Sequence, residues 1–182
     1  SSATFRSASV KILFSIAAKQ GLKVRMADVK AAYTKAFLDE TETTYLRLPP
    51  RPKEVDGKCV MDESPKYVKL IRSLYGLKQA GLLWNKLVTK TLLDYGCQQL
   101  EWDPCVFTFE AGEQRLYIAL YVDELLFCAT DDSIVNNLLS YLEQQFGEVS
   151  EVTEGASHLE LFIGHLPDGS IKLSQSGYIA KI

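Results

Sequence analysis

The stretch "LYIALYVDELLFCAT", residues 116–130, decides the fold because two acids interrupt a run of strand-forming residues. Asp123 and Glu124 divide it into two apolar segments, each long enough for a β-strand. An antiparallel hairpin with the acids at its tip is the simplest structure for this pattern. A buried carboxylate pair is costly unless a positive charge lies beside it. The two acids therefore indicate either a turn in water or a site that holds a cation.

The composition is that of one globular domain. The chain has 182 residues, of which 47% are apolar and 24% charged, enough for a full hydrophobic core. Its net charge of −3 argues against a strongly basic nucleic-acid module, although it is compatible with a local basic groove. No stretch resembles a signal peptide or a membrane span, and the scattered cysteines predict reduced core thiols in an intracellular protein: Cys59, Cys97, Cys105 and Cys128.

Hydrophobic periodicity predicts helices over residues 8–21, 78–96 and 131–147. The second is expected to bury a stripe at spacing i, i+4 that consists of Leu83, Leu87, Thr91 and Tyr95. Strands are predicted at 22–29, 43–50, 66–76, 125–130, 158–166 and 170–175, and residues 105–122 are predicted to form two strands joined by a Gly-containing turn. This order of elements predicts an α+β fold, in which an antiparallel sheet carries its helices on one face.

A third acid, Asp28, closes the predicted strand 22–29. If this strand neighbours the hairpin, three carboxylates meet at one sheet edge and need a hard divalent cation or raised pKa values. Two Mg²⁺ ions about 4 Å apart would suit an in-line phosphoryl displacement. The alternative is an ordinary solvated turn, which spacing alone favours because Asp tolerates turn geometry. The lack of a strong turn signal such as Asn-Gly weakens this alternative slightly.

Four motifs, the last of them part of the stretch quoted first, bear on this choice: "VRMADVKAAYTKAFL", "SLYGLKQAGLLW", "EWDPCVF" and "LYIALYVDELLF". In this order and spacing they resemble the motifs of copia-type LTR-retrotransposon reverse transcriptases, which are RNA-directed DNA polymerases. The later stretch "LELFIGHLPDGSIKLSQSGYIAKI" resembles the segment with which the family grips the primer end. The resemblance extends from about Phe5 to Ile182. It implies a polymerase palm with a ferredoxin-like sheet, forming one domain over 1–182 with part of the fingers at about 41–80. Most of the fingers, the thumb and the RNase H region are expected to be absent.

The resemblance also implies roles for single residues. It implies that Asp28, Asp123 and Glu124 are catalytic. It also implies that Asp28, Asp123 and the carbonyl group of Val29 bind Mg²⁺ or Mn²⁺, with two ions expected if the chain is active. The expected nucleotide-binding residues are Val29, Tyr33 under the incoming sugar, Lys78 and Gln79. The expected primer-binding residues are Phe162, Ile163 and Gly164. The implied partners are an RNA or DNA template-primer, nucleoside triphosphates, and a protein partner or larger complex that supplies the missing parts.

Simpler interpretations of these residues stay open. Tyr33 also fits a core aromatic, Lys78 and Gln79 a solvated helix start, and Phe162 to Gly164 an apolar strand. We expect Trp84 and Trp102 to be packing residues.

Besides the parts that are expected to be absent, the sequence departs from the family pattern at two places. Glu124 stands where the family has the second aspartate of "YVDD", and Gly81 and Leu82 replace a proline and a basic residue. Glutamate keeps the charge but reaches about one methylene further, so we expect weakened chemistry. Two hypotheses follow: a reverse transcriptase palm that works with its missing parts, or a non-catalytic descendant kept as a scaffold for a protein or RNA partner. An unrelated ferredoxin-like regulatory module is a third option, which the ordered motifs disfavour.

Overall fold

The computed structural model describes residues 4–39, 43–62, 64–152, 162–166, 168, 170–174 and 179. Its core is a six-stranded antiparallel sheet in the order β10-β1-β9-β8-β7-β6. The strands of this sheet are β1 (Lys23–Val29), β6 (Gln98–Gln99), β7 (Val106–Ala111), β8 (Gln114–Tyr121), β9 (Glu124–Ala129) and β10 (Val149–Val152). Around it lie the helices α1 (Ser7–Gln20), α2 (Ala80–Tyr95) and α3 (Asp132–Phe146), together with the short 3₁₀ helix η1 (Ala32–Lys35). The predicted mixture of helices and antiparallel strands is thus confirmed.

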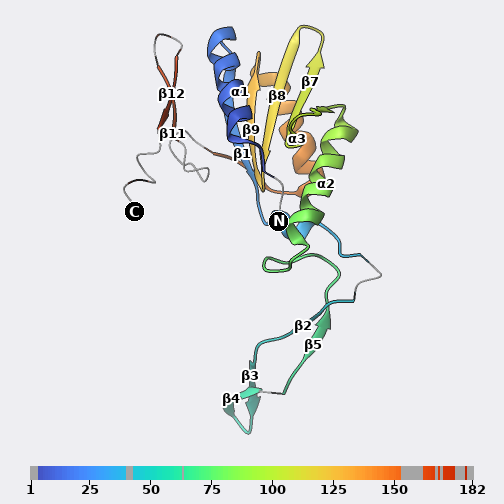
Figure 1. Cartoon of the computed structure of the whole chain (residues 1–182). Helices are drawn as coiled ribbons and strands as arrows, with labels where there is room; N and C mark the ends of the chain where they lie inside the picture. The colour runs from blue at the N-terminus through green and yellow to red at the C-terminus, as the bar shows by residue number, and fades with distance from the viewer. Residues whose placement is uncertain are drawn as a thin grey trace.

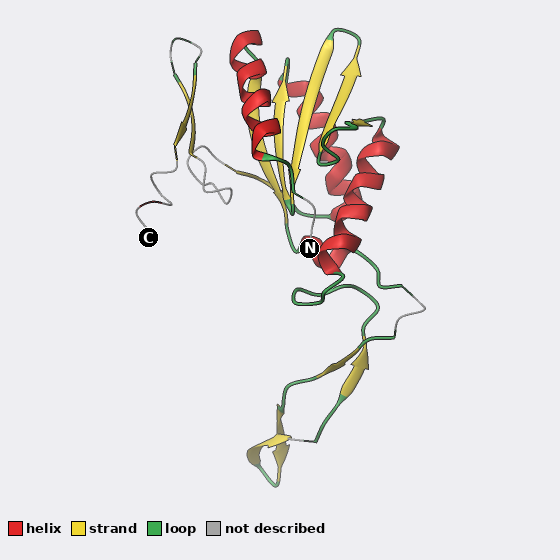
Figure 2. Ribbon diagram, viewed as in Figure 1, coloured by secondary structure: helices red, strands yellow, loops and turns green. Residues whose placement is uncertain are grey.

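The expectation that the helices cover one face of the sheet is wrong. Helix α1 packs on one face with a cluster that includes Met26 and Leu126, whereas α2 and α3 pack on the other with Ala27 and Leu125 (Figures 1 and 2). Neighbouring residues of β1 and β9 thus point into different clusters, as strand geometry requires. Both faces of the central strands are apolar, so both need a cover.

Capping residues determine where two of the helices begin or end. Helix α1 ends at Gly21, whose φ of 65° is the left-handed conformation that favours glycine. Helix α3 begins after Asp131, whose side chain accepts a hydrogen bond from the backbone of Ser133 at 2.7 Å. Helix α2 buries a stripe that differs from the predicted one and consists of Ala80, Gly81, Trp84, Val88, Thr91 and Leu92.

In the part of the chain that the structure describes, three two-stranded ribbons are separate from the six-stranded sheet. They are β2 (Tyr45–Arg47) with β5 (Tyr67–Lys69), β3 (Arg51–Val55) with β4 (Lys58–Asp62), and β11 (Phe162–His165) with β12 (Ile171–Ser174). The first two lie in one extended arm that points away from the sheet below α2 (Figures 1 and 2). This arm falls within the segment for which the sequence predicts part of the fingers.

Two expectations about single side chains are wrong. Cys59 is exposed, unlike the three buried cysteines, so it is no core thiol. Trp102 has 81% of its surface exposed, so it is no packing residue, whereas Trp84 is fully buried as expected. Among the described residues, no helix has the length and apolar character needed to cross a membrane.

Candidate active site

The backbone positions of the three acids named by the sequence come together where the neighbouring strands β1 and β9 meet the β8–β9 turn. Asp28 lies directly opposite Glu124 in the antiparallel pairing of β1 with β9. The next residue, Val29, donates its backbone N–H to the carbonyl oxygen of Asp123 at 3.0 Å. Val29 itself is buried with 1% exposure. These backbone contacts place the end of β1 against the turn between β8 and β9, as the sequence predicts.

The acids differ in exposure. Asp28 and Asp123 are half-buried, but Glu124 has only 3% of its surface exposed. It is the first residue of β9 rather than part of the tip, because the turn itself consists of Val122 and Asp123. Tyr121, opposite Glu124, is flanked by the N-terminal segment, since Thr4 forms a β-bridge with it and the Phe5 ring lies 5.1 Å away. The third acid is therefore enclosed at a crowded edge of the sheet.

The turn has an unusual backbone. Val122 has a φ of 59°, in the left-handed region that β-branched residues rarely adopt. Its carbonyl oxygen accepts a hydrogen bond from the indole N–H of Trp84 on α2. The Trp84 ring in turn packs edge-on against Phe146 of α3, with ring centroids 5.0 Å apart. The turn that carries Asp123 is therefore tied to both helices beneath it.

Two tyrosines lie next to the acids. The rings of Tyr33, in η1, and Tyr75 have centroids 4.6 Å apart. Burial, and then the negative charge of Asp123, raises the pKa of Tyr33 above its usual value. The pKa of Tyr75 is raised by burial first, then by Asp123 and more weakly by Asp28. Tyr33 also packs against the core, so both interpretations of this residue remain compatible with its position.

Tyr75 lies in the motif "SLYGLKQAGLLW" but was not among the predicted site residues. Its position depends on a contact between distant segments. Leu38 donates its backbone N–H to Ile71 at 2.9 Å, and Ser73 donates its own to Ala36 at 2.8 Å. Arg72 reinforces the contact, because its guanidinium lies 4.4 Å from the centre of the Phe37 ring. This pairing brings Tyr75 to Tyr33.

Lys78 and Gln79 lie where α2 begins. Lys78 is exposed and Gln79 is half-buried in the N-cap position, where its side chain makes no capping hydrogen bond. The same helix reaches the acid-bearing turn through Trp84. The positions fit both a nucleotide contact and a solvated helix start.

The expected primer-binding residues lie in a sheet of their own. The backbone of Phe162, Ile163 and Gly164 belongs to β11, which pairs only with β12 in the part of the chain that the structure describes. The side chains of Phe162 and Ile163 lie outside the described residues. Ile171 of β12 packs against the α1 cluster. The described geometry thus brings the three acids together, but not the primer-binding residues with them.

The donor chemistry of the acid edge suits a hard divalent cation, because carboxylate and carbonyl oxygens are the ligands that Mg²⁺ prefers. Within the described ranges, however, no three His, Cys, Asp or Glu side chains are gathered as a ready-made metal site. The residue types therefore suit a metal ion, and the half-buried Asp28 and Asp123 are the donors that such an ion could reach.

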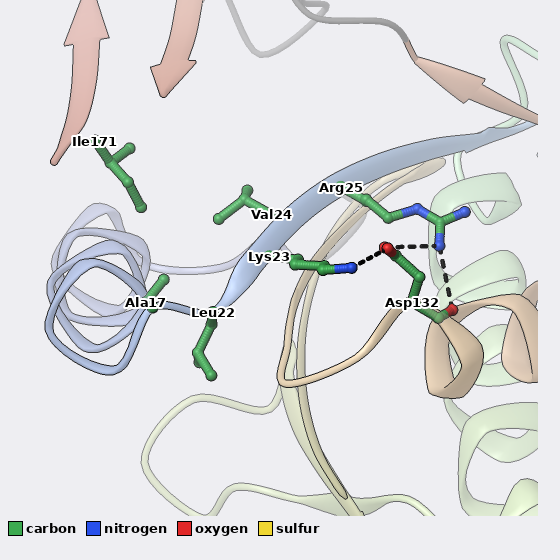
Figure 3. A pocket seen from close by; sticks show the side chains of 8 residues that line it. Ala17, Leu22, Lys23, Val24, Arg25, Asp132 and Ile171 are labelled. Atoms are coloured by element: carbon green, nitrogen blue, oxygen red, sulfur yellow. Dashed lines mark hydrogen bonds and ion pairs between the residues drawn. The ribbon is translucent and has the colours of Figure 1, made fainter. Parts of the chain in front are cut away.

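A cavity of about 370 Å³ lies at the other end of β1. It is lined by Ala17 and Leu22 near the end of α1, by Ile171 of β12, and by Lys23 and Arg25, which both reach Asp132 (Figure 3). Because Lys23 begins the strand that Asp28 nearly ends, this cavity is separate from the acid edge.

Comparison with known proteins gives the family. The model of the family described as reverse transcriptase (RNA-dependent DNA polymerase) matches residues 1–182. The chain belongs to this family. It is a copia-type reverse transcriptase domain, since the relatives it matches come from transposons of this kind.

The retrovirus-related Pol polyprotein from transposon RE1 of Arabidopsis thaliana is 30% identical over 98% of this chain and 12% of its own length. A transposon Ty5-1 protein of Saccharomyces cerevisiae is 32% identical over 85% of this chain and 47% of its own length. Among solved structures, telomerase from Candida albicans with a fragment of telomeric RNA gives a TM-score of 0.45 at 12% identity, covering 96% of this chain and 36% of that one. This reverse transcriptase domain thus spans less than half the length of the curated relatives named here.

Proposed function

We propose that this chain is the palm, with part of the fingers, of an RNA-directed DNA polymerase that adds nucleotides to a primer. The observation that carries the proposal is the meeting of Asp28, Asp123 and Glu124 at one sheet edge, through the Asp28–Glu124 pairing and the hydrogen bond from Val29 to Asp123. The family membership supplies the reaction class.

In this proposal Asp28 and Asp123 would hold two Mg²⁺ or Mn²⁺ ions, with the carbonyl group of Val29 as a further ligand. When bound, the metal would lower the pKa of the primer 3′-hydroxyl and stabilise the pyrophosphate leaving group. Glu124 lies directly opposite Asp28 and has only 3% of its surface exposed. Carboxylates fixed at this end of the sheet would hold the ions at set positions, which would lower the entropic part of the barrier.

The aromatic pair beside the acids forms the sugar-facing side of the proposed nucleotide site. The rings of Tyr33 and Tyr75 are tilted by 33° with centroids 4.6 Å apart, and burial, followed by the charge of Asp123, raises the pKa of both. A ring in this position sets the room available at the 2′ carbon of an incoming nucleotide. Lys78 and Gln79, at the start of α2, would contact its phosphates and base.

The arm of β2 to β5 supports nucleic-acid binding. Residues 43–72 contain seven lysines and arginines against four aspartates and glutamates, a net charge of +3 in a chain whose net charge is −3. One face of the β2–β5 ribbon presents two exposed tyrosines and two cations, paired as Tyr45 with Lys69 and Arg47 with Tyr67. Exposed aromatic rings between cations are typical of surfaces that bind single strands by stacking and phosphate contacts.

A non-catalytic scaffold is the second candidate function. The observation in its favour is Glu124, which is longer than the aspartate of the family pattern and has 3% exposure. A third acid that is displaced within a two-metal site would weaken the reaction, because such sites tolerate little displacement.

Two measurements separate these candidates. The first is a thermal-shift titration with Mn²⁺, in which a ligand that binds only the folded form raises the melting temperature. The second is primer extension by a chimera in which residues 1–182 replace the matching segment of the RE1 polyprotein. We expect metal-dependent extension that rises with Glu124→Asp and is lost with Asp28→Asn or Asp123→Asn.

The substitution Asp94→Asn is a matched control, since Asp94 lies on the exposed side of α2 and pairs with Lys90. Extension that survives Asp28→Asn and Asp123→Asn would exclude these acids as catalytic residues. A chimera that stays inactive even with Glu124→Asp, while the chain folds normally, would favour the scaffold.

A further inference from the structure

The turn that carries Asp123 holds a strained residue in place. Val122 has a φ of 59°, and a β-branched side chain is disfavoured in this left-handed region. Such a conformation persists only where the surroundings hold it. Two hydrogen bonds do so here, one from Trp84 to the carbonyl oxygen of Val122 and one from Val29 to the carbonyl oxygen of Asp123.

The Trp84 contact is directional. Its ring is fully buried and packs edge-on against Phe146, so ring packing alone fixes where its single N–H points. That N–H meets the carbonyl group of the strained residue itself. A phenylalanine at this position would keep an aromatic ring against Phe146 but would offer no donor.

We infer that Trp84 is a positioning residue, whose indole N–H holds the Val122–Asp123 turn in its strained conformation and thereby keeps the Asp123 carboxylate beside Asp28. The part of this inference that concerns Asp123 rests on the proposed function. If the hydrogen bond from Trp84 is lost, Val122 relaxes toward a negative φ. This change of the backbone moves Asp123, the residue that follows.

The test compares Trp84→Phe with Phe146→Leu in the full chain. Phe146→Leu removes packing from the Trp84 ring and retains its N–H, so it is the matched control for lost stability. Amide hydrogen exchange is followed at two sites. One is the N–H of Val29, which bonds to the Asp123 carbonyl group, and the other is that of Thr130, which bonds to Arg115 at the far end of the same hairpin.

We expect Trp84→Phe to speed exchange at Val29 about tenfold relative to Thr130, because it opens the turn locally. Phe146→Leu should change the two amides alike. Adding Val122→Gly should reduce the effect of Trp84→Phe to less than about twofold, because glycine adopts a positive φ without strain. Equal changes at both amides in Trp84→Phe, or no rescue by Val122→Gly, would overturn the inference.

Binding of Mn²⁺ extends the test to Asp123. We expect Trp84→Phe to weaken binding about fivefold and Phe146→Leu to leave it within about twofold. If the unsubstituted chain binds no Mn²⁺, the proposed function fails, and the exchange experiment alone then decides whether Trp84 holds the turn. If the chain binds Mn²⁺ and Trp84→Phe does not weaken binding, the link from Trp84 to Asp123 is wrong.

Discussion

Asp28 and Glu124 lie directly opposite each other in the pairing of β1 with β9. Like charges directly opposite each other on neighbouring strands repel, which destabilises the pairing. We expect Asp28→Asn and Glu124→Gln to be coupled in their effects on the free energy of unfolding, because each relieves the same repulsion. A double-mutant cycle by urea denaturation should give a coupling of about 0.5–1 kcal/mol, with the double variant gaining less than the two single variants combined. Additive effects would mean that the two carboxylates do not interact.

The β2–β5 ribbon should bind single-stranded RNA through its tyrosine face. Tyr45→Ala and Tyr67→Ala should each weaken binding by about 1–3 kcal/mol, the range for a base stacked on an aromatic ring. Arg47→Gln should reduce the slope of log affinity against log salt by about 0.7, the value for one phosphate contact on a single strand. Fluorescence anisotropy with a labelled oligonucleotide at several salt concentrations measures both.

Leu46→Ala is the control for this experiment, because Leu46 lies on the opposite face of the ribbon, paired with Val68. Equal losses from Leu46→Ala and Tyr45→Ala would indicate a general loss of ribbon structure instead of a binding face.

Asp103 anchors the start of α1. Its carboxylate accepts hydrogen bonds from the backbone of Arg6 at 2.9 Å, from the Ser9 hydroxyl at 2.6 Å and from the backbone of Cys105 at 3.1 Å. Burial alone would raise the pKa of Asp103, but these hydrogen bonds outweigh it and lower the pKa below the usual 3.8. Because the pKa in the folded state is the lower one, Asp103 stabilises the fold above about pH 4 and loses this effect as the pH falls further.

Asp103→Asn should therefore lower the free energy of unfolding at pH 7 by about 1–3 kcal/mol, the typical cost of losing charge-assisted hydrogen bonds. It should also flatten the pH dependence of stability below pH 4. Urea denaturation at pH 7 and at pH 3 measures both effects, with Asp94→Asn as a surface control. A loss that persists undiminished at pH 3 would rule out the charge of Asp103 as its cause.

The cysteines give a direct test of the core. Burial raises the pKa of Cys97 to about 12, of Cys105 to about 11 and of Cys128 to about 12, whereas Cys59 is exposed. Only thiolates react quickly with a disulfide reagent such as dithionitrobenzoate. We expect one fast-reacting thiol in the folded chain at pH 7 and four in urea, with Cys59→Ser removing the fast one. Several fast thiols in the folded chain would contradict the described packing.

Local patterns in the sequence were sufficient to predict most helices and strands. The arrangement of helices over both faces was missed, although the signal was present in Leu125, Leu126, Phe127 and Cys128, an unbroken apolar run in β9. A strand that is apolar on both faces needs a cover on both. The predicted buried stripe of α2 was also misplaced. Leu83 is next to Trp84 and Leu87 is next to Val88, so the pattern leaves the position of the buried face ambiguous by about one residue.

In the candidate site, too, only features that depend on local sequence could be predicted. The acids could be predicted, because strand ends and interrupted apolar runs are local features. The Tyr33–Tyr75 ring contact and the hydrogen bond from Trp84 to Val122 depend on contacts between segments far apart in the chain. A buried indole N–H requires an acceptor, so the existence of a partner for Trp84 was foreseeable, but its identity depended on the fold.

The place of β1 within the sheet has a consequence for synthesis on the ribosome. This strand, which bears Asp28, lies between β9 and β10 and receives both neighbours only after most of the chain has emerged. Until then its backbone groups have no sheet to join, so β1 is completed among the last parts of the domain. A translation product that stops before residue 124 lacks both flanking strands, so a prematurely ended message yields no assembled acid edge.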